Sequence, residues 1–267
     1  MTWWCSATGL AWNWEWRAYP GIWLVILVLS GLYPALLRRG HAVRGVDWHA
    51  IRYGLGVVVV WISLDWPLGP LGAGYLASAH AVSYILLTLV AAPLLLTGIP
   101  PSSISRLAHR KPGWGMALRF LARPLPGLVG YSTILILTHL PQAVDQLLRS
   151  QVGTMLIDLG WLLGGLMLWW PVLAPAEVGR LSLPLKLAYL FVCTLPPILP
   201  SAFLTFSDYP LYAVYELAPR VMGISARDDQ QAAGVVMKVV GDVPIWLAFG
   251  IVFFRWAKAE SAPSRAG

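Results

Sequence analysis

The sequence YLASAHAVSYILLTLVAAPLLLTG, residues 75–98, contains no acidic residue, no Lys and no Arg. As an α-helix it would be about 36 Å long at about 1.5 Å per residue, which is enough to cross a bilayer. His80 and Tyr84 share one helical stripe with small and polar residues, whereas most of the leucines lie elsewhere. Because polar groups in hydrocarbon must face protein or a water-filled cavity, we expect His80 to point into a helical bundle.

Composition places the whole chain in the membrane class. Of its 267 residues 58% are hydrophobic and only 12% are charged, and the mean hydropathy is +0.66. The net charge of +7 could suggest nucleic acid, but the basic residues lie between apolar runs, where they orient a protein in the bilayer. We therefore expect no nucleic-acid partner. Cys5 and Cys193 form no CxxC pair, and no structural disulfide is expected.

Seven apolar runs predict an all-α membrane bundle with seven transmembrane helices. The expected spans are residues 21–37, 53–66, 75–98, 127–140, 153–173, 184–206 and 230–256. The Pro- and Gly-rich segment 66–74 is predicted to be a tight turn, and the short fourth span to need residues 118–121 or its flanks to complete a crossing. We expect one domain over residues 1–260, followed by a disordered cytoplasmic tail, 261–267.

Charge and aromatic residues predict how the bundle is oriented. Most Lys and Arg residues follow the first, third and fifth spans or lie in the tail, so the N-terminus is expected outside and the C-terminus in the cytoplasm. The Trp-rich residues 1–19 are expected to form an interfacial belt. Gly160 and Gly164 have the GxxxG spacing that allows close helix approach.

This orientation places most of the unusual polar residues in the outer leaflet. They are His80, His139, Thr154, Met155, Asp158, Asp229, Met237 and Lys238, with Asp242 a turn deeper. Lys238 and Asp242 are four residues apart and can pair, either to fix helix packing or as part of an ion path or ligand site. His80 has two interpretations as well: a hydrogen bond to a neighbouring helix, or a metal-binding or other functional role.

Seven sequence motifs resemble the multi-span CtaG-type cytochrome c oxidase assembly factor family. They are LYPALLRRG (32–40), DWPLGPLG (65–72), SAHAVSYILLTLVAAPLLLTGIP (78–100), HLPQAVDQ (139–146), LMLWWPVL (166–173), FSDYPLYAVY (206–215) and DQQAAGVVM (229–237). The resemblance implies a non-enzymatic, seven-span protein of the bacterial plasma membrane that helps haem-copper oxidases mature at the copper-containing stage. Oxidase subunits or other assembly factors would be its partners.

The chain departs from the family pattern at the positions that would bind copper. The resemblance implies His-x-x-x-His pairs in the third and fifth spans, but Tyr84 follows His80, and Thr154 and Asp158 stand where the second pair is expected. Lys238 stands where the family often has Trp. The candidate metal ligands are therefore His80, His139, Asp158, Met155 and Met237. The other candidate functional residues are Tyr84, Thr154, Asp229, Lys238 and Asp242. Since a carboxylate is a poor Cu(I) ligand, we expect weak or no Cu(I) binding, with Asp158 paired to an imidazolium or to Lys238.

Two further classes of function are alternatives to assembly. A proton-coupled or small-solute transporter would use the intramembrane charges Asp158, Lys238 and Asp242 together with proline-broken helices. No inverted repeat is visible to support it. An enzyme is not expected, because the sequence has no nucleophile–base constellation, no HExxH and no Gly-rich phosphate loop.

Overall fold

The computed structural model describes residues 2–37 and 47–261, and over these residues it is helical with no strand. The elements are α1 (Pro20–Leu37), α2 (Trp48–Leu64), α3 (Leu68–Gly74), α4 (Ala77–Ile85), η1 (Leu86–Ala91), α5 (Ala92–Gly98), α6 (Pro101–Arg110), α7 (Pro112–Leu121), α8 (Pro124–His139), α9 (Pro141–Leu147), α10 (Gln151–Leu173), α11 (Leu183–Cys193), α12 (Ile198–Phe206), α13 (Ala213–Glu216), α14 (Ala226–Val235), η2 (Val236–Val240) and α15 (Gly241–Glu260). The predicted all-α class is confirmed.

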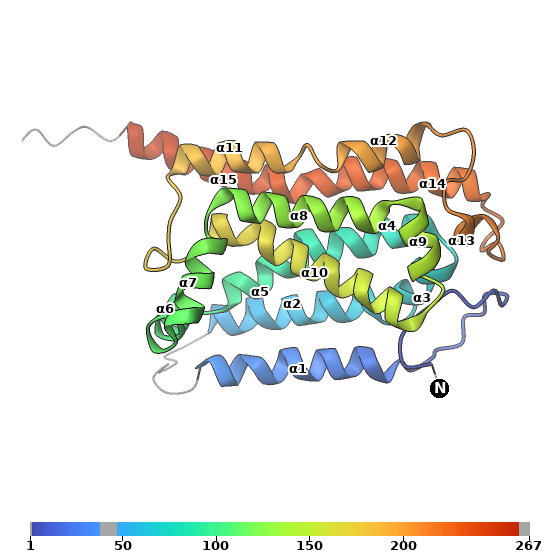
Figure 1. Cartoon of the computed structure of the whole chain (residues 1–267), viewed down its shortest axis with the longest axis horizontal. Helices are drawn as coiled ribbons and strands as arrows, with labels where there is room; N and C mark the ends of the chain where they lie inside the picture. Colours follow the sequence, from blue (N-terminus) through green and yellow to red (C-terminus); the bar gives the residue numbers. More distant parts are fainter. Residues whose placement is uncertain (1, 38–46, 262–267) are drawn as a thin grey trace, which may run out of the picture.

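The long helices lie side by side along one axis, as Figure 1 shows. In the described residues five helices are long and apolar enough to cross a membrane, or up to seven if each bent pair counts as one span. The chain is therefore a multi-pass membrane protein. We call the end that carries α3, α9 and α13 the α9 end, and the opposite end, with α6 and α7, the α6 end (Figure 1). The N-terminal segment lies at the α9 end and α15 finishes at the α6 end.

One local prediction is wrong. The segment 66–74 is mostly helix α3 rather than a tight turn, bent by 44° from α2. Helix α8 qualifies as a membrane span only together with α7, which contains residues 118–121 and is bent by 76° from α8. Most of the predicted tail, residues 262–267, and the basic loop residues 38–46 lie outside the described residues.

The decisive span, 77–98, is buried as expected, and it contains a π-helical segment. Helix α4 continues through η1 into α5, and the last span likewise runs from α14 through η2 into α15. His80 is only 6% exposed, which confirms that it points into the bundle. Leu86 lies on a less buried face, as expected for the leucines of this span, but Leu89 is buried near Gly241 of α15.

Glycines on α10 allow two helices to pack closely on its surface. Ile134 of α8 covers Gly160 and Gly164, so the GxxxG pair does receive a neighbouring helix. Backbone approaches α10 closely at Gly165, where an added Cβ would lie 2.5 Å from the carbonyl oxygen of Thr88. Thr88 also donates its hydroxyl to the Trp161 carbonyl at 3.0 Å, and Trp169 Nε1 donates to the Thr88 carbonyl at 3.1 Å. These contacts fix α10 against the span that carries His80.

Candidate functional site

Two buried histidines meet near the α9 end of the bundle. His80 lies in the first turn of α4 and His139 is the last residue of α8, and their ring centroids are 6.3 Å apart. Trp161 of α10 contacts both rings, at 4.5 Å from His80 and 5.9 Å from His139. Both histidines are less than one-tenth exposed. Helices far apart in sequence thus bring together two of the predicted site residues.

Tyrosines complete the walls of this cluster. Tyr84 lies one turn along α4 from His80 and its ring is 5.3 Å from that of His139, so residues 80 and 84 do share a face. Its hydroxyl is 3.0 Å from the hydroxyl of Tyr131 on α8. Tyr215 of α13 lies 6.0 Å from His80 and donates its hydroxyl to the Gly72 carbonyl at 2.5 Å. Burial raises the pKa of Tyr215 well above its ordinary value, so it stays a neutral donor.

The two imidazoles differ in their hydrogen bonds. His139 Nδ1 lies 2.8 Å from the Leu135 carbonyl oxygen, which can only accept, so this nitrogen carries the proton. The Tyr212 hydroxyl in turn donates to the His139 carbonyl at 3.0 Å. His80 Nε2 is buried and has no hydrogen-bond partner. An orphaned buried nitrogen is unusual, and it marks His80 as the member of the pair with unused bonding capacity.

An apolar cleft borders His139 on its other side. Its volume is about 260 Å³, and it lies between the α8–α9 corner and α12. Apart from His139 and Tyr212 its walls are aliphatic, aromatic or proline side chains, including Ile136, Pro200 and Phe203. His139 therefore separates the aromatic cluster from this cleft.

Asp158 does not pair with an imidazolium or with Lys238, and that prediction is wrong. Its Oδ2 accepts from Trp4 Nε1 at 2.8 Å, and Lys238 pairs elsewhere. Trp4 is only 1% exposed and is held by Gln151, whose Oε1 accepts from the backbone N–H groups of Trp3 and Trp4. The prediction that residues 1–19 form only an interfacial belt is wrong at Trp4, although Trp14 and Trp16 are exposed.

Lys238 and Asp242 form the predicted pair, with Nζ and Oδ2 2.7 Å apart. Lys238 also donates to the Thr194 carbonyl at 3.0 Å, and Thr194 ends α11 where the sixth span is broken. The ammonium therefore satisfies a carbonyl that the helix break frees, as well as the carboxylate. This arrangement suits a packing role for the pair.

Asp229 caps the helix that carries His80. Its Oδ2 accepts from the Ala77 N–H at 2.5 Å, while Oδ1 accepts from the Ser78 N–H at 3.3 Å and from the Ser78 hydroxyl. A carboxylate at a helix N-terminus satisfies orphan N–H groups and is stabilised by the helix dipole. Asp229 thus fixes the start of α4 and positions His80.

Thr154, Met155 and Met237, the remaining predicted residues, make their contacts elsewhere. Thr154 donates its hydroxyl to the Ser150 carbonyl of its own helix at 3.2 Å. Met155 packs at the edge of the hydrophobic core and Met237 is buried inside it. In residues 2–37 and 47–261 no group of three or more His, Cys, Asp or Glu side chains could hold a metal ion.

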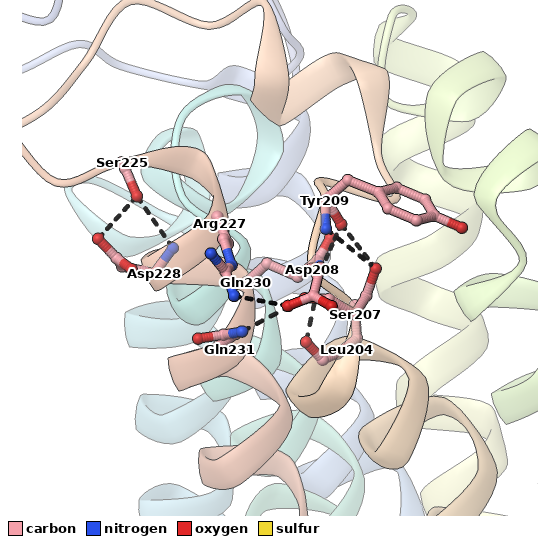
Figure 2. Close-up of polar contacts among 9 residues, drawn as sticks. All are labelled: Leu204, Ser207, Asp208, Tyr209, Ser225, Arg227, Asp228, Gln230 and Gln231. Carbon is pink, nitrogen blue, oxygen red and sulfur yellow. Dashed lines mark hydrogen bonds and ion pairs between the residues drawn. The ribbon is translucent and has the colours of Figure 1, made fainter.

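A polar junction beside the site joins α12 to α14, as Figure 2 shows. Gln230 Nε2 donates to the carbonyls of Leu204 and Tyr209 at 3.4 and 3.2 Å (Figure 2). Its Oε1 accepts from the Leu211 N–H at 2.6 Å. Nearby, Arg227 and Asp208 form an exposed ion pair at 2.7 Å (Figure 2). These contacts fix the path of residues 207–211, which lead to Tyr212 and Tyr215.

Sequence reasoning missed several residues of the site. Trp161, Tyr131, Tyr212, Tyr215 and Gln230 all contribute to it or hold it in place. A signal existed for three of them, because Tyr212 and Tyr215 fall in motif 206–215 and Gln230 falls in motif 229–237, and both motifs carried the family resemblance. Nothing in the local pattern singles out Trp161 among 15 tryptophans.

The fold and the site define a class of protein, a multi-pass membrane helix bundle with a buried histidine–aromatic cluster at one end. The family model of the cytochrome c oxidase caa3 assembly factor (Caa3_CtaG) matches residues 31–259, most of the chain. The chain belongs to this family, and the resemblance inferred from its motifs is confirmed. No curated protein and no solved structure matches it.

Proposed function

We propose that this protein is a non-catalytic assembly factor for a caa3-type haem-copper oxidase and acts in the bacterial plasma membrane. The observation that carries the proposal is the family match over residues 31–259. The buried cluster at the α9 end supports it, because intramembrane ionisable groups mark functional positions. Its direct partners would be oxidase subunits or other assembly factors.

Copper is the metal that the family resemblance implies. Few of the side chains around His80 are groups that bind Cu(I) well. His80 Nε2 is unpartnered and could bind a soft ion, and His139 is its only histidine neighbour in the aromatic cluster. Asp158 is engaged by Trp4 and Tyr84 offers a phenol instead of an imidazole. We infer that this chain binds Cu(I) weakly or not at all, and that it supports assembly through protein contacts at the α9 end.

The contacts of the three intramembrane charges weaken the transporter hypothesis. Lys238 and Asp242 neutralise each other, and Asp158 is hydrogen-bonded by the Trp4 indole. The family match gives the transporter no support.

Gene deletion tests the proposed function. We expect the deletion strain to lose most of its caa3-type oxidase activity and the copper content of that oxidase, and wild-type chain expressed in trans to restore both. Normal activity with normal copper content in the deletion strain would refute the proposal. The deletion strain can also be complemented with His80→Ala, and with Trp14→Ala as the matched control at an exposed position. When both variants reach wild-type membrane levels, a defect in His80→Ala alone assigns the loss of oxidase activity to the buried cluster and not to a lower amount of protein.

A further inference from the structure

A second apolar cleft lies at the α6 end, far from the histidine cluster along the bundle. Its volume is about 290 Å³, and helices α1, α5, α6, α7 and α10 surround it. The lining is hydrocarbon and aromatic apart from Ser103, with Leu36, Leu107, Leu118, Leu163 and Trp170 among the contributors. A partly open apolar cleft of this kind between membrane helices suits a hydrocarbon chain rather than a polar solute.

Helices α6 and α7 form a hairpin across this end of the bundle. The bend of 76° between α7 and α8 turns α7 away from the bundle axis (Figure 1). Its exposed side chains include Trp114, Met116 and Phe120, which are amphipathic or apolar and suit the boundary between headgroups and acyl chains. The hairpin therefore has the character of an interfacial segment that roofs the cleft.

The hairpin carries only positive charge. Residues 101–123 contain five Arg and Lys residues and no Asp or Glu. Arg110, Lys111, Arg119 and Arg123 are exposed. Arg119 directly follows Leu118, which lines the cleft from α7, and Arg110 is three residues from Leu107, which lines it from α6. Both helices that cover the cleft therefore carry exposed basic residues close in sequence to its lining.

We propose that this cleft binds one acyl chain of an anionic phospholipid whose phosphate is held by the basic residues of the α6–α7 hairpin. The bilayer supplies the acyl chain wherever a cleft opens to it, and the single sign of charge selects an anionic headgroup. Arg is suited to this role because its planar donor fork matches phosphate oxygens. The bound lipid would fill the cleft between α1, α7 and α10 and hold these helices together.

Native mass spectrometry of the full chain in neutral detergent tests the proposal. We expect phosphatidylglycerol to bind with at least tenfold higher affinity than phosphatidylcholine with the same acyl chains. Arg119→Gln combined with Arg123→Gln should reduce this affinity about tenfold or more, whereas Arg149→Gln, a basic residue between α9 and α10, should leave it unchanged. Leu163→Trp should also weaken binding by filling the cleft.

Each contrary result has a definite meaning. Equal binding of the two lipids, or loss of binding in Arg149→Gln as large as in the double variant, would overturn the headgroup site. Unchanged binding in a folded Leu163→Trp would overturn the acyl-chain site. Leu36→Trp is the second cleft variant should Leu163→Trp fail to fold, with circular dichroism and gel filtration as the checks. Adding inorganic phosphate should compete only weakly, because it supplies no acyl chain.

Discussion

At the scale of single residues, the histidine pair combines burial with incomplete hydrogen bonding. His139 has a backbone acceptor for Nδ1, whereas His80 Nε2 has no partner. Leaving a buried polar atom unsatisfied costs about 1–3 kcal/mol, so the site retains His80 at a cost to stability. Such a cost is typical of positions kept for function rather than for folding.

Titration with Cu(I) against a competing chelator tests what the pair can bind. We expect no tight stoichiometric binding by the wild-type chain. Among the described residues, no Cys and no third His completes a metal-binding group with the two imidazoles. Tight binding of one Cu(I) per chain that disappears in His80→Ala would contradict this expectation. It would show that the pair is a working copper site, with Met155 or Met237 as the candidates for a further ligand.

Trp4→Phe tests the contact between the N-terminal segment and Asp158. The change keeps most of the buried aromatic surface but removes the indole donor, so we expect the free energy of unfolding to fall by about 1.5–3 kcal/mol. Thermal unfolding in detergent measures it. Trp14→Phe is the matched control, since Trp14 is exposed, and it should change stability by less than about 0.5 kcal/mol. Equal effects of the two changes would show that the hydrogen bond contributes nothing.

These residues also show how far the sequence can be interpreted. Helical spacing predicted that His80 and Tyr84 share an inward face and that Lys238 pairs with Asp242, because both depend only on neighbours along one helix. It could not predict that Trp4 bonds Asp158, since that contact joins residues 154 apart in the chain. The meeting of His80 with His139 depends likewise on how separate helices pack.

At the scale of helices, Gly165 lets α10 pack closely on a neighbouring helix although it lies outside the GxxxG pair. Gly160 and Gly164 have the familiar spacing, yet an added Cβ would lie no nearer than 3.5 Å to the side chain of Ile134 at either position. Gly165 faces backbone instead, and backbone cannot move aside as a side chain can. Periodic small residues therefore predicted a helix contact, but not which contact is tightest.

Gly165→Ala should be a damaging substitution on α10. Its methyl group would lie 2.5 Å from the Thr88 carbonyl oxygen, and overpacking of this kind costs about 1–3 kcal/mol. Gly160→Ala is the matched control, because its nearest neighbour is 3.7 Å away and Ala favours helix by about 1 kcal/mol over Gly. Thermal unfolding of both variants in detergent should show a fall for position 165 alone. A comparable fall at position 160 would contradict this account.

At the scale of the whole molecule, the bundle has two chemically different ends. The α9 end carries the N-terminal segment and lies beside the histidine cluster, and the α6 end carries the basic hairpin and the end of α15 (Figure 1). The positive-inside rule predicts that the α6 end faces the cytoplasm.

Cysteine labelling in whole cells tests the orientation. Asn13→Cys should react with a membrane-impermeant maleimide in intact cells, and Ser261→Cys only after permeabilisation, because both positions are exposed at opposite ends. The native thiols should give little background: Cys5 and Cys193 are buried, and burial raises the pKa of Cys5 well above its ordinary value. The reverse labelling pattern would show that the N-terminus is cytoplasmic.

The π-helical segment at Leu86–Ala91 divides the histidine-bearing span into two separately aimed halves. A π-turn accommodates about one extra residue, which rotates everything beyond it by about 100° relative to an uninterrupted helix. The half that holds His80 can therefore face His139 while the half beyond the π-turn directs Ala92 at Gly165. One inserted residue thus rotates one half of the span relative to the other, so that the two halves contact two different neighbours on different sides of the helix.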